Sequence, residues 1–137
     1  MSETQLTGGC LCGAIRYSIK RLTNAVMCHC KQCQKAQGVG FACNFPVPRE
    51  DFTLHDEEHL LTAYRSSATK QRMFCGRCGS PIYSQRDNSE DLRVRAGSLD
   101  DSTKLQVVEH IFAGDAADWS PIDDDLPAHS SFEPSRK

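Results

Sequence analysis

The stretch Cys75-Gly76-Arg77-Cys78-Gly79 has the spacing of a zinc knuckle, which would supply half of a metal site. Two thiolates three positions apart can bind one zinc ion when the turn between them is tight, and the two glycines permit such a turn. A closed tetrahedral site needs two more ligands. The stretch Cys10-Leu11-Cys12, flanked by glycines, offers them. We therefore predict one structural zinc ion on Cys10, Cys12, Cys75 and Cys78.

A second group of cysteines lies in Cys28-His29-Cys30-Lys31-Gln32-Cys33. Its three thiolates leave one position of a tetrahedral ion open, and this is the layout of a catalytic or ligand-binding zinc site. We predict a second zinc ion on Cys28, Cys30 and Cys33. The chain would then hold two zinc ions, one in a closed site and one in an open site.

Other partitions of the cysteines are open. Cys30-x-x-Cys33 could join Cys75-x-x-Cys78 in one four-cysteine ribbon, but the 41 residues between them exceed the roughly 15–20 of such a ribbon. That arrangement would also leave three cysteines without a role. Alternatively, the chain holds one metal ion and several inert cysteines. Cys43 alternates with Phe41 and Phe45, which favours a small buried residue over a fourth ligand.

Composition narrows the class of protein. The chain has 137 residues, about one domain at roughly 150 residues per domain. Sixteen basic and eighteen acidic residues give a net charge of −2, which argues against a nucleic-acid partner. No apolar run reaches the ~18 residues of a membrane-spanning helix, and residues 1–5 lack the pattern of a signal peptide. We expect a cytoplasmic protein, in which eight cysteines, seven of them in tight clusters, indicate metal binding rather than disulfides.

Hydrophobic alternation predicts a mainly β fold. Between residues 14 and 20, Ile15, Tyr17 and Ile19 alternate with polar residues, as in a half-buried strand. We expect a turn at Gly8-Gly9, a short helix at 31–37, and further strands at 24–27, 40–47, 52–54, 60–65, 70–74, 82–84, 91–96 and 107–112. Many short strands suggest an open barrel or a sandwich. Residues 1–120 would form the domain, and residues 121–137, with a solvated turn at 123–125, an extended arm and a frayed tail.

The ordered motifs resemble the glutathione-dependent formaldehyde-activating family, also called the CENP-V/GFA domain. The stretches that carry the resemblance are Gly8–Tyr17, Cys28–Cys33, Phe74–Ser80, Arg95–Asp100, His110–Phe112 and Trp119. Together they run through roughly residues 7 to 120, so the resemblance is far more specific than a lone C-x-x-C. It implies a mainly β zinc fold of short antiparallel strands, named after the Rab-binding protein Mss-four. It also implies zinc ions on the same two cysteine groups.

The resemblance also implies a reaction. In the family, glutathione adds to formaldehyde to give S-(hydroxymethyl)glutathione, which is a carbon–sulfur lyase step in reverse. An open zinc site suits this chemistry, because the ion can hold a substrate thiol as the thiolate or polarise the aldehyde oxygen. We expect Cys28, Cys30 and Cys33 to form the catalytic site. A related thiol or another small aldehyde would suit the same site.

Residues near the motifs are candidates for the remaining roles. His29 is a candidate catalytic residue that could also point away from the metal, and His110 is expected to be a structural histidine. Glutathione carries two carboxylates, so its pocket needs cations or backbone donors. The candidate cations are Lys31, Lys35, Arg65 and Arg95, each of which could instead be a solvated surface charge, and the candidate backbone donors are Gly97 and Ser98.

Two other functions compete with the enzyme. The chain could be a non-catalytic zinc-binding module for protein partners, and glutathione binding at the three-cysteine group would separate these two hypotheses. A redox sensor that forms a Cys30–Cys33 disulfide and releases zinc ranks last. Either a monomer or a homodimer is compatible with the sequence.

Overall fold

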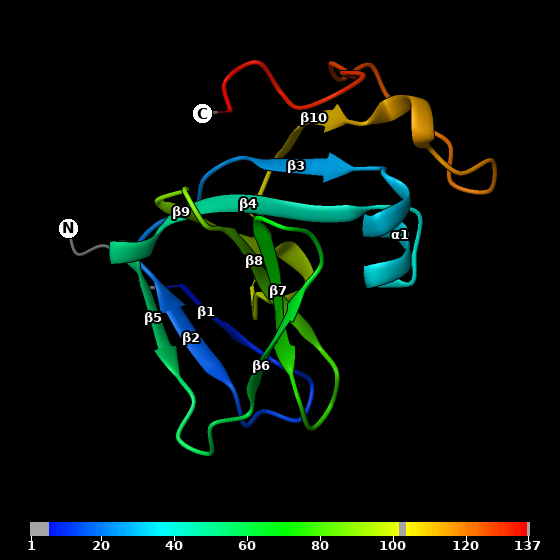
Figure 1. Ribbon diagram of the computed structural model, residues 1–137. Helices are drawn as coiled ribbons and strands as arrows, with labels where there is room; N and C mark the ends of the chain where they lie inside the picture. Colours follow the sequence, from blue (N-terminus) through cyan, green and yellow to red (C-terminus); the bar gives the residue numbers. More distant parts are fainter. Residues whose placement is uncertain (1–5, 102–103, 137) are drawn as a thin grey trace.

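The computed structural model describes residues 6–101 and 104–136, which form two β-sheets (Figure 1). The small sheet has the strand order β1-β2-β5, and the large sheet has the order β10-β3-β4-β9-β8-β7-β6. The strands are β1 (Leu6–Gly9), β2 (Arg16–Ile19), β3 (Ala25–Cys28), β4 (Ala42–Pro48), β5 (Phe52–His55), β6 (Leu61–Arg65), β7 (Lys70–Cys75), β8 (Pro81–Arg86), β9 (Asp91–Arg95) and β10 (Val107–Ile111). This architecture confirms the predicted mainly β class with open sheets.

Helix α1 (Lys31–Gln37) has the bounds that the sequence predicts. It begins where Cys30 Sγ accepts a hydrogen bond from the backbone N–H of Cys33. It ends at Gly38, whose φ of 69° is left-handed and whose N–H donates to the Gln34 carbonyl. Within the described residues no helix is long and apolar enough to cross a membrane.

Two local predictions about the strands were wrong. Gly8 and Gly9 do not form a turn but pair with Tyr17 and Arg16 inside β1. A Cβ at Gly8 would overlap with the Tyr17 hydroxyl and the Ser98 carbonyl oxygen, so glycine serves close packing here. In addition, β10 pairs with β3 in parallel, although all strands were expected to be antiparallel. Parallel pairing needs a long connection, and nearly the whole large sheet lies between these two strands in the chain.

The main core lies between the two sheets. Tyr17 and Ile19 of β2 pack with Phe45, Val47 and other residues of the large sheet, all fully buried. The Tyr17 ring stacks on Phe52, and Phe52 meets Tyr83 edge-on. A second, smaller cluster contains Val26, Cys28, Cys33, Ala42 and Ile111. The three-cysteine group therefore has an apolar base of its own, separate from the main core.

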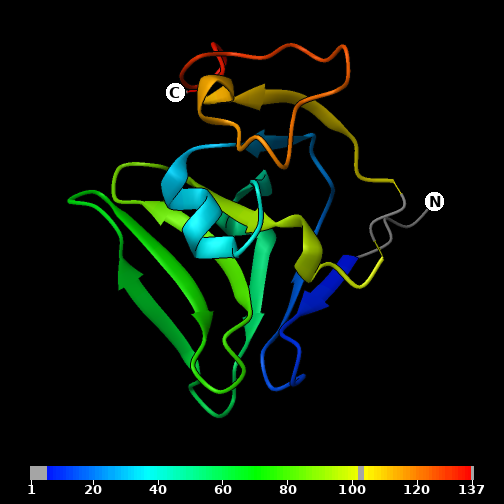
Figure 2. The same cartoon turned by 90° about the vertical axis from the view of Figure 1, so that its right-hand side faces the viewer.

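The C-terminal arm packs along β10 (Figures 1 and 2). His110 N–H donates to the Pro127 carbonyl at 2.8 Å, and His129 N–H donates to the His110 carbonyl at 2.9 Å. Further along, Phe112 N–H donates to the carbonyl of Ser131. The expected fraying of the tail is therefore not observed: the arm bonds to the β10 edge as far as Ser131, and ion pairs of Glu133 with Arg93 and Arg136 hold its end. The domain boundary at residue 120 stays a prediction.

Candidate metal centres and binding cavity

The four-cysteine group joins the two sheets. Cys10 and Cys12 follow β1, whereas Cys75 ends β7 and Cys78 lies in the turn before β8. Their four sulfur atoms lie within 4.8 Å of one another. Cys12 Sγ is 3.5 Å from Cys10 Sγ and 3.9 Å from Cys75 Sγ. A zinc–sulfur bond of about 2.3 Å places the sulfurs of a tetrahedron roughly 3.8 Å apart, so this group fits a zinc ion.

The segments that follow Cys10 and Cys75 direct hydrogen-bond donors toward the sulfur atoms. Cys78 N–H donates to Cys75 Sγ at 3.4 Å, and Ile15 N–H donates to Cys10 Sγ at 3.3 Å. The Ser80 hydroxyl lies 3.2 Å from Cys78 Sγ. This hydrogen bond is the main reason why the pKa of Cys78 falls to about 5. Cys78 is therefore prepared for the thiolate form that a metal ion requires.

The three-cysteine group lies where β3 passes into α1. Cys28 ends β3, Cys30 caps the helix, and Cys33 lies in its first turn. Their sulfur atoms also lie within 4.8 Å of one another. Hydrogen bonds from the Cys28 and Cys30 thiols lower the pKa of Cys33, and the charges of Lys70 and Arg72 lower it further. The donor set suits an ion that prefers thiolates.

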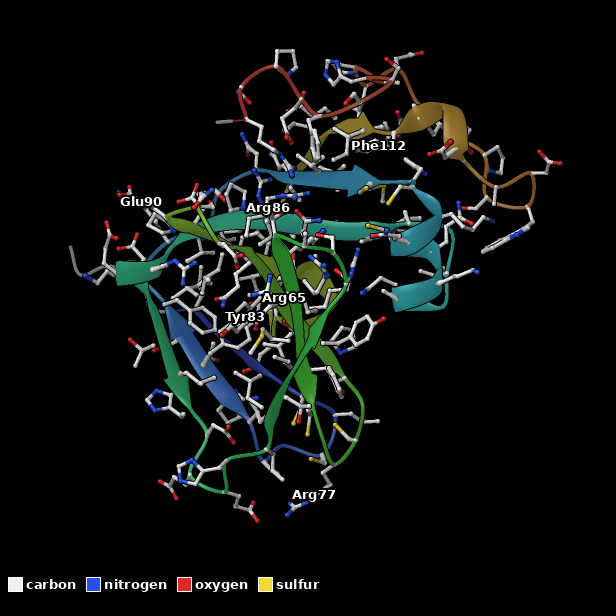
Figure 3. All side chains as sticks on the ribbon, viewed as in Figure 1. Arg65, Arg77, Tyr83, Arg86, Glu90 and Phe112 are labelled. Carbon is white, nitrogen blue, oxygen red and sulfur yellow. The ribbon has the colours of Figure 1, made fainter. Side chains whose placement is uncertain are left out.

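The two groups are those that the sequence predicted. Within the part of the chain that the structure describes, Cys43 joins neither group. It lies half-buried beside the main core. The structure also places the groups apart, since Arg77 of the four-cysteine turn and helix α1 lie in different parts of the molecule (Figures 1 and 3).

A cavity of about 1010 Å³ opens at the three-cysteine group. Its wall includes all three cysteines, the rings of Phe112 and Phe132, and six cationic side chains, namely Lys31, Lys70, Arg72, Arg86, Arg93 and Arg136. Arg72 Nη2 lies 3.8 Å from Cys33 Sγ. Arg72 Nη1 is buried and has no hydrogen-bond partner within the described residues, so it is free to bind an anion. Burial, with the nearby charge of Arg72, lowers the pKa of Lys70 to about 8.

The register of the large sheet gathers these cations. Lys70 faces Arg86 across β7 and β8, and Arg72 faces Ser84, which in turn faces Arg93. Five of the six cations were not predicted from the sequence, because four come from three separate strands and Arg136 comes from the arm. The spacing of two in β7, Lys70 and Arg72, was a usable signal, because residues at i and i+2 share a face of a strand.

The candidate substrate residues of the sequence analysis lie in different places. Lys31 lines the cavity, whereas Lys35 is exposed outside it. Arg65 pairs with Asp87 at 3.2 Å and does not belong to the cavity wall. The other candidates line a smaller cavity of about 600 Å³ beside Cys10 and Cys43; they are Arg95, Gly97 and Ser98. The structure thus brings only Lys31 of these candidates to the three-cysteine cavity.

His29 belongs to a chain of hydrogen bonds rather than to the cavity wall. Its Nε2 lies 2.8 Å from His110 Nδ1, and His110 Nε2 lies 3.0 Å from the Asp124 carboxylate. Because the carboxylate accepts from His110 Nε2–H, His110 Nδ1 must accept from His29 Nε2–H. Burial and the neighbouring His110 lower the pKa of His29. His110 is structural, as predicted, and Asp124 anchors the arm instead of lying in a purely solvated turn.

The model of the family described as glutathione-dependent formaldehyde-activating enzyme matches residues 5–115. The chain belongs to this family. A Halomonas elongata protein named "Putative glutathione-dependent formaldehyde-activating enzyme" is 27% identical over 128 residues, which cover 86% of this chain and 81% of that protein. A Podospora anserina protein of the same name is 31% identical over 77 residues, 54% of this chain and 36% of that protein.

A solved structure supports the fold. The crystal structure of a Rhodobacter sphaeroides protein superposes with a TM-score of 0.60 at 25% identity, and covers 74% of this chain and 99% of that chain. The match to the family model ends at residue 115, before the arm. Phe132, Glu133 and Arg136 of the arm nevertheless line the three-cysteine cavity. This GFA-family chain therefore completes its cavity with residues outside the family match.

Proposed function

We propose that this chain is a zinc-dependent carbon–sulfur lyase of the GFA type. It would condense glutathione, or a related thiol, with formaldehyde or another small aldehyde to an S-hydroxymethyl adduct. The observation that carries the proposal is the three-cysteine group in the wall of a large cavity that six cationic and five acidic side chains also line. The family model and the names of the two relatives support the choice of thiol and aldehyde.

The three thiolates of Cys28, Cys30 and Cys33 would hold the zinc ion. Bound there, the ion would keep one position open and lower the pKa of a substrate thiol. The apolar base of this group, which includes Ile111, keeps water from its inner side.

The cations of the cavity would orient the substrate. Glutathione is an anion with two carboxylates, and guanidinium groups bind carboxylates in a fixed, often bidentate geometry. Arg72, with a free buried nitrogen beside Cys33, is well placed to bind a carboxylate near the reacting sulfur. Held in this way, the thiol would meet the aldehyde at a high effective concentration.

A proton must reach the aldehyde oxygen as the carbon–sulfur bond forms. The thiolate sulfur attacks the carbonyl carbon, the carbon–oxygen double bond opens, and the oxygen takes one proton. Lys70 is the candidate donor, because it lines the cavity and burial lowers its pKa to about 8. An ammonium group with such a pKa gives up its proton near neutral pH more readily than an ordinary lysine.

Native mass spectrometry of the purified chain, with and without glutathione, tests the proposal. We expect two zinc ions and a glutathione adduct in the wild type, and one zinc ion and no adduct in Cys30→Ser. In parallel, exchange NMR with ¹³C-formaldehyde should show faster adduct formation with the wild type than with Cys30→Ser. One firmly held zinc ion with no adduct and no acceleration would instead favour a non-catalytic zinc-binding module for protein partners.

A further inference from the structure

Glu133 places a buried carboxylate in the wall of the cavity. Its residue is only 4% exposed, although it belongs to the C-terminal arm. It forms an ion pair with Arg136, three residues further along the arm, and Arg136 Nη2 also donates to Glu133 Oε2 at 3.2 Å. Glu133 Oε2 lies 3.8 Å from Arg93 Nη1 of β9. One carboxylate thus lies between two guanidinium groups that both line the cavity.

Arg93, Glu133 and Arg136 lie together at one corner of the cavity. The two positive charges at this corner require an anion. Burial and the positive charge of Arg136 lower the pKa of Arg93 to about 10, so these two cations destabilise each other. For Glu133, burial raises the pKa, but the two arginines outweigh burial and hold the pKa below its ordinary value. A buried charge without a partner is strongly unfavourable. Glu133 is the carboxylate that pairs with both arginines, and Asp91 adds a second negative charge near Arg93.

A third cation lies at the same corner. The guanidinium carbon of Arg86 lies 5.2 Å from the centre of the Phe132 ring, and that of Arg136 lies 4.6 Å from it. The Phe132 ring meets Phe112 edge-on at 5.1 Å, and Figure 3 shows Phe112 next to the arm, with Arg86 below. Phe132 therefore holds Arg86 near Arg136, whose guanidinium group pairs with the Glu133 carboxylate.

We propose that Arg93, Arg136 and Arg86 form a carboxylate subsite of the cavity, in which Glu133 is the resident ligand that a substrate carboxylate replaces. This inference rests on the proposed function in one respect, namely that the ligand is an anionic thiol. Glu133 and Arg136 lie outside the family match, so they would be additions of this chain to a subsite whose other two arginines lie within the match. Competition from Glu133 would weaken the binding of every carboxylate ligand at this corner.

The test measures the binding of S-methylglutathione to the zinc-loaded full chain by calorimetry. This probe keeps both carboxylates of glutathione but has no free thiol, so it is not a substrate. We expect Glu133→Gln to bind it roughly tenfold more tightly than the wild type, because glutamine keeps the shape but no longer competes as an anion. Adding Arg136→Gln to this variant should reverse the gain.

Glu90→Gln is the matched control. Glu90 also lines the cavity, but it is exposed and has no ion pair within the described residues. We expect this variant to bind the probe as the wild type does. Equal gains in Glu90→Gln and Glu133→Gln would show an effect of net charge alone and would overturn the subsite.

Two further results would also overturn the inference. One is weaker binding by a folded Glu133→Gln variant, since Glu133 would then contact the ligand or only hold the arm. The other is no binding of the probe to this variant. If Glu133→Gln fails to fold, the single variant Arg136→Gln tests the subsite instead. The inference then holds only if this variant binds the probe more weakly than the wild type. None of these outcomes depends on catalysis, so they stand even if the aldehyde reaction is absent.

Discussion

Tyr17 shows how one buried hydroxyl couples packing to pH. Its side chain is almost fully buried, and its hydroxyl lies 2.6 Å from Ser98 Oγ. Burial raises the pKa of Tyr17 to about 12, whereas an unfolded tyrosine titrates near 10. Because the raised pKa belongs to the folded state, the contribution of the neutral Tyr17 side chain to the free energy of unfolding is fully present below pH 10. It is lost as the pH rises through about 12, by about 3 kcal/mol in total.

The comparison of wild type with Tyr17→Phe tests this prediction. Denaturant unfolding between pH 9 and pH 11.5 should show a steeper loss of stability in the wild type, because phenylalanine has no proton to release. Ultraviolet difference titration between the two proteins should place the ionisation of Tyr17 well above pH 10. A Tyr17 that ionises near pH 10 in the folded protein would contradict the prediction.

Lys70 is the proposed proton donor to the aldehyde oxygen, and its replacement tests this role. Lys70→Met should lower the rate of adduct formation roughly a hundredfold at pH 7, the lower end of what a general acid contributes. The number of bound zinc ions should not change, because the side chain of Lys70 is not a ligand. Lys35→Met removes the same charge from an exposed position outside the cavity and should leave the rate unchanged. If both variants are equally active, Lys70 is not the proton donor.

At the scale of the elements, the arm has one aromatic anchor, Phe132, besides its hydrogen bonds to β10. Phe132 contacts Phe112 and two guanidinium groups, although its residue is 40% exposed. Phe132→Ala should cost about 1–2 kcal/mol in the local stability of the arm. Amide hydrogen exchange should therefore become faster at residues 127–136 and stay unchanged in β7 and β8. Tyr64→Ala, which removes an exposed aromatic ring from β6, serves as the control and should leave the arm protected.

The elements also show which information lies in the local sequence. Helix α1 was predicted with its bounds, because its helix formers end at Gly38. The alternation of Ile15, Tyr17 and Ile19 likewise indicated β2. Alternation says which face of a strand is buried but not which strand lies beside it. The parallel pairing of β3 with β10 and the docking of the arm on β10 were therefore not predictable from local patterns.

The same distinction holds for the candidate site. The cysteine groups were predictable because most of their ligands are neighbours in the chain, and only Cys10 and Cys12 lie far from Cys75 and Cys78. The cations of the cavity are neighbours only through the register of β7, β8 and β9. The role of Glu133 was not predictable, because it lies in a segment whose composition is typical of a disordered tail. Its burial depends on an ion pair with Arg93 of β9.

At the scale of the whole molecule, the two cysteine groups have different positions in the fold. The four-cysteine group links β1 of the small sheet to β7 and β8 of the large sheet. A metal ion there would cross-link segments 63 residues apart and would connect one sheet to the other. The three-cysteine group connects only β3 and α1, which already pack in one apolar cluster. Loss of the first ion should therefore affect the whole fold, and loss of the second only the cavity.

Cys75→Ser and Cys30→Ser separate these roles. Structural zinc contributes on the order of 10 kcal/mol to folding, which is as much as the total stability of a small domain. We expect Cys75→Ser to give an unfolded or aggregated chain, and Cys30→Ser to keep the β-sheet circular dichroism spectrum, a cooperative thermal transition and one zinc ion. Equal stability of the two variants would mean that the four-cysteine group does not hold the sheets together. An unfolded Cys30→Ser with a folded Cys75→Ser would reverse the assignment of the structural site.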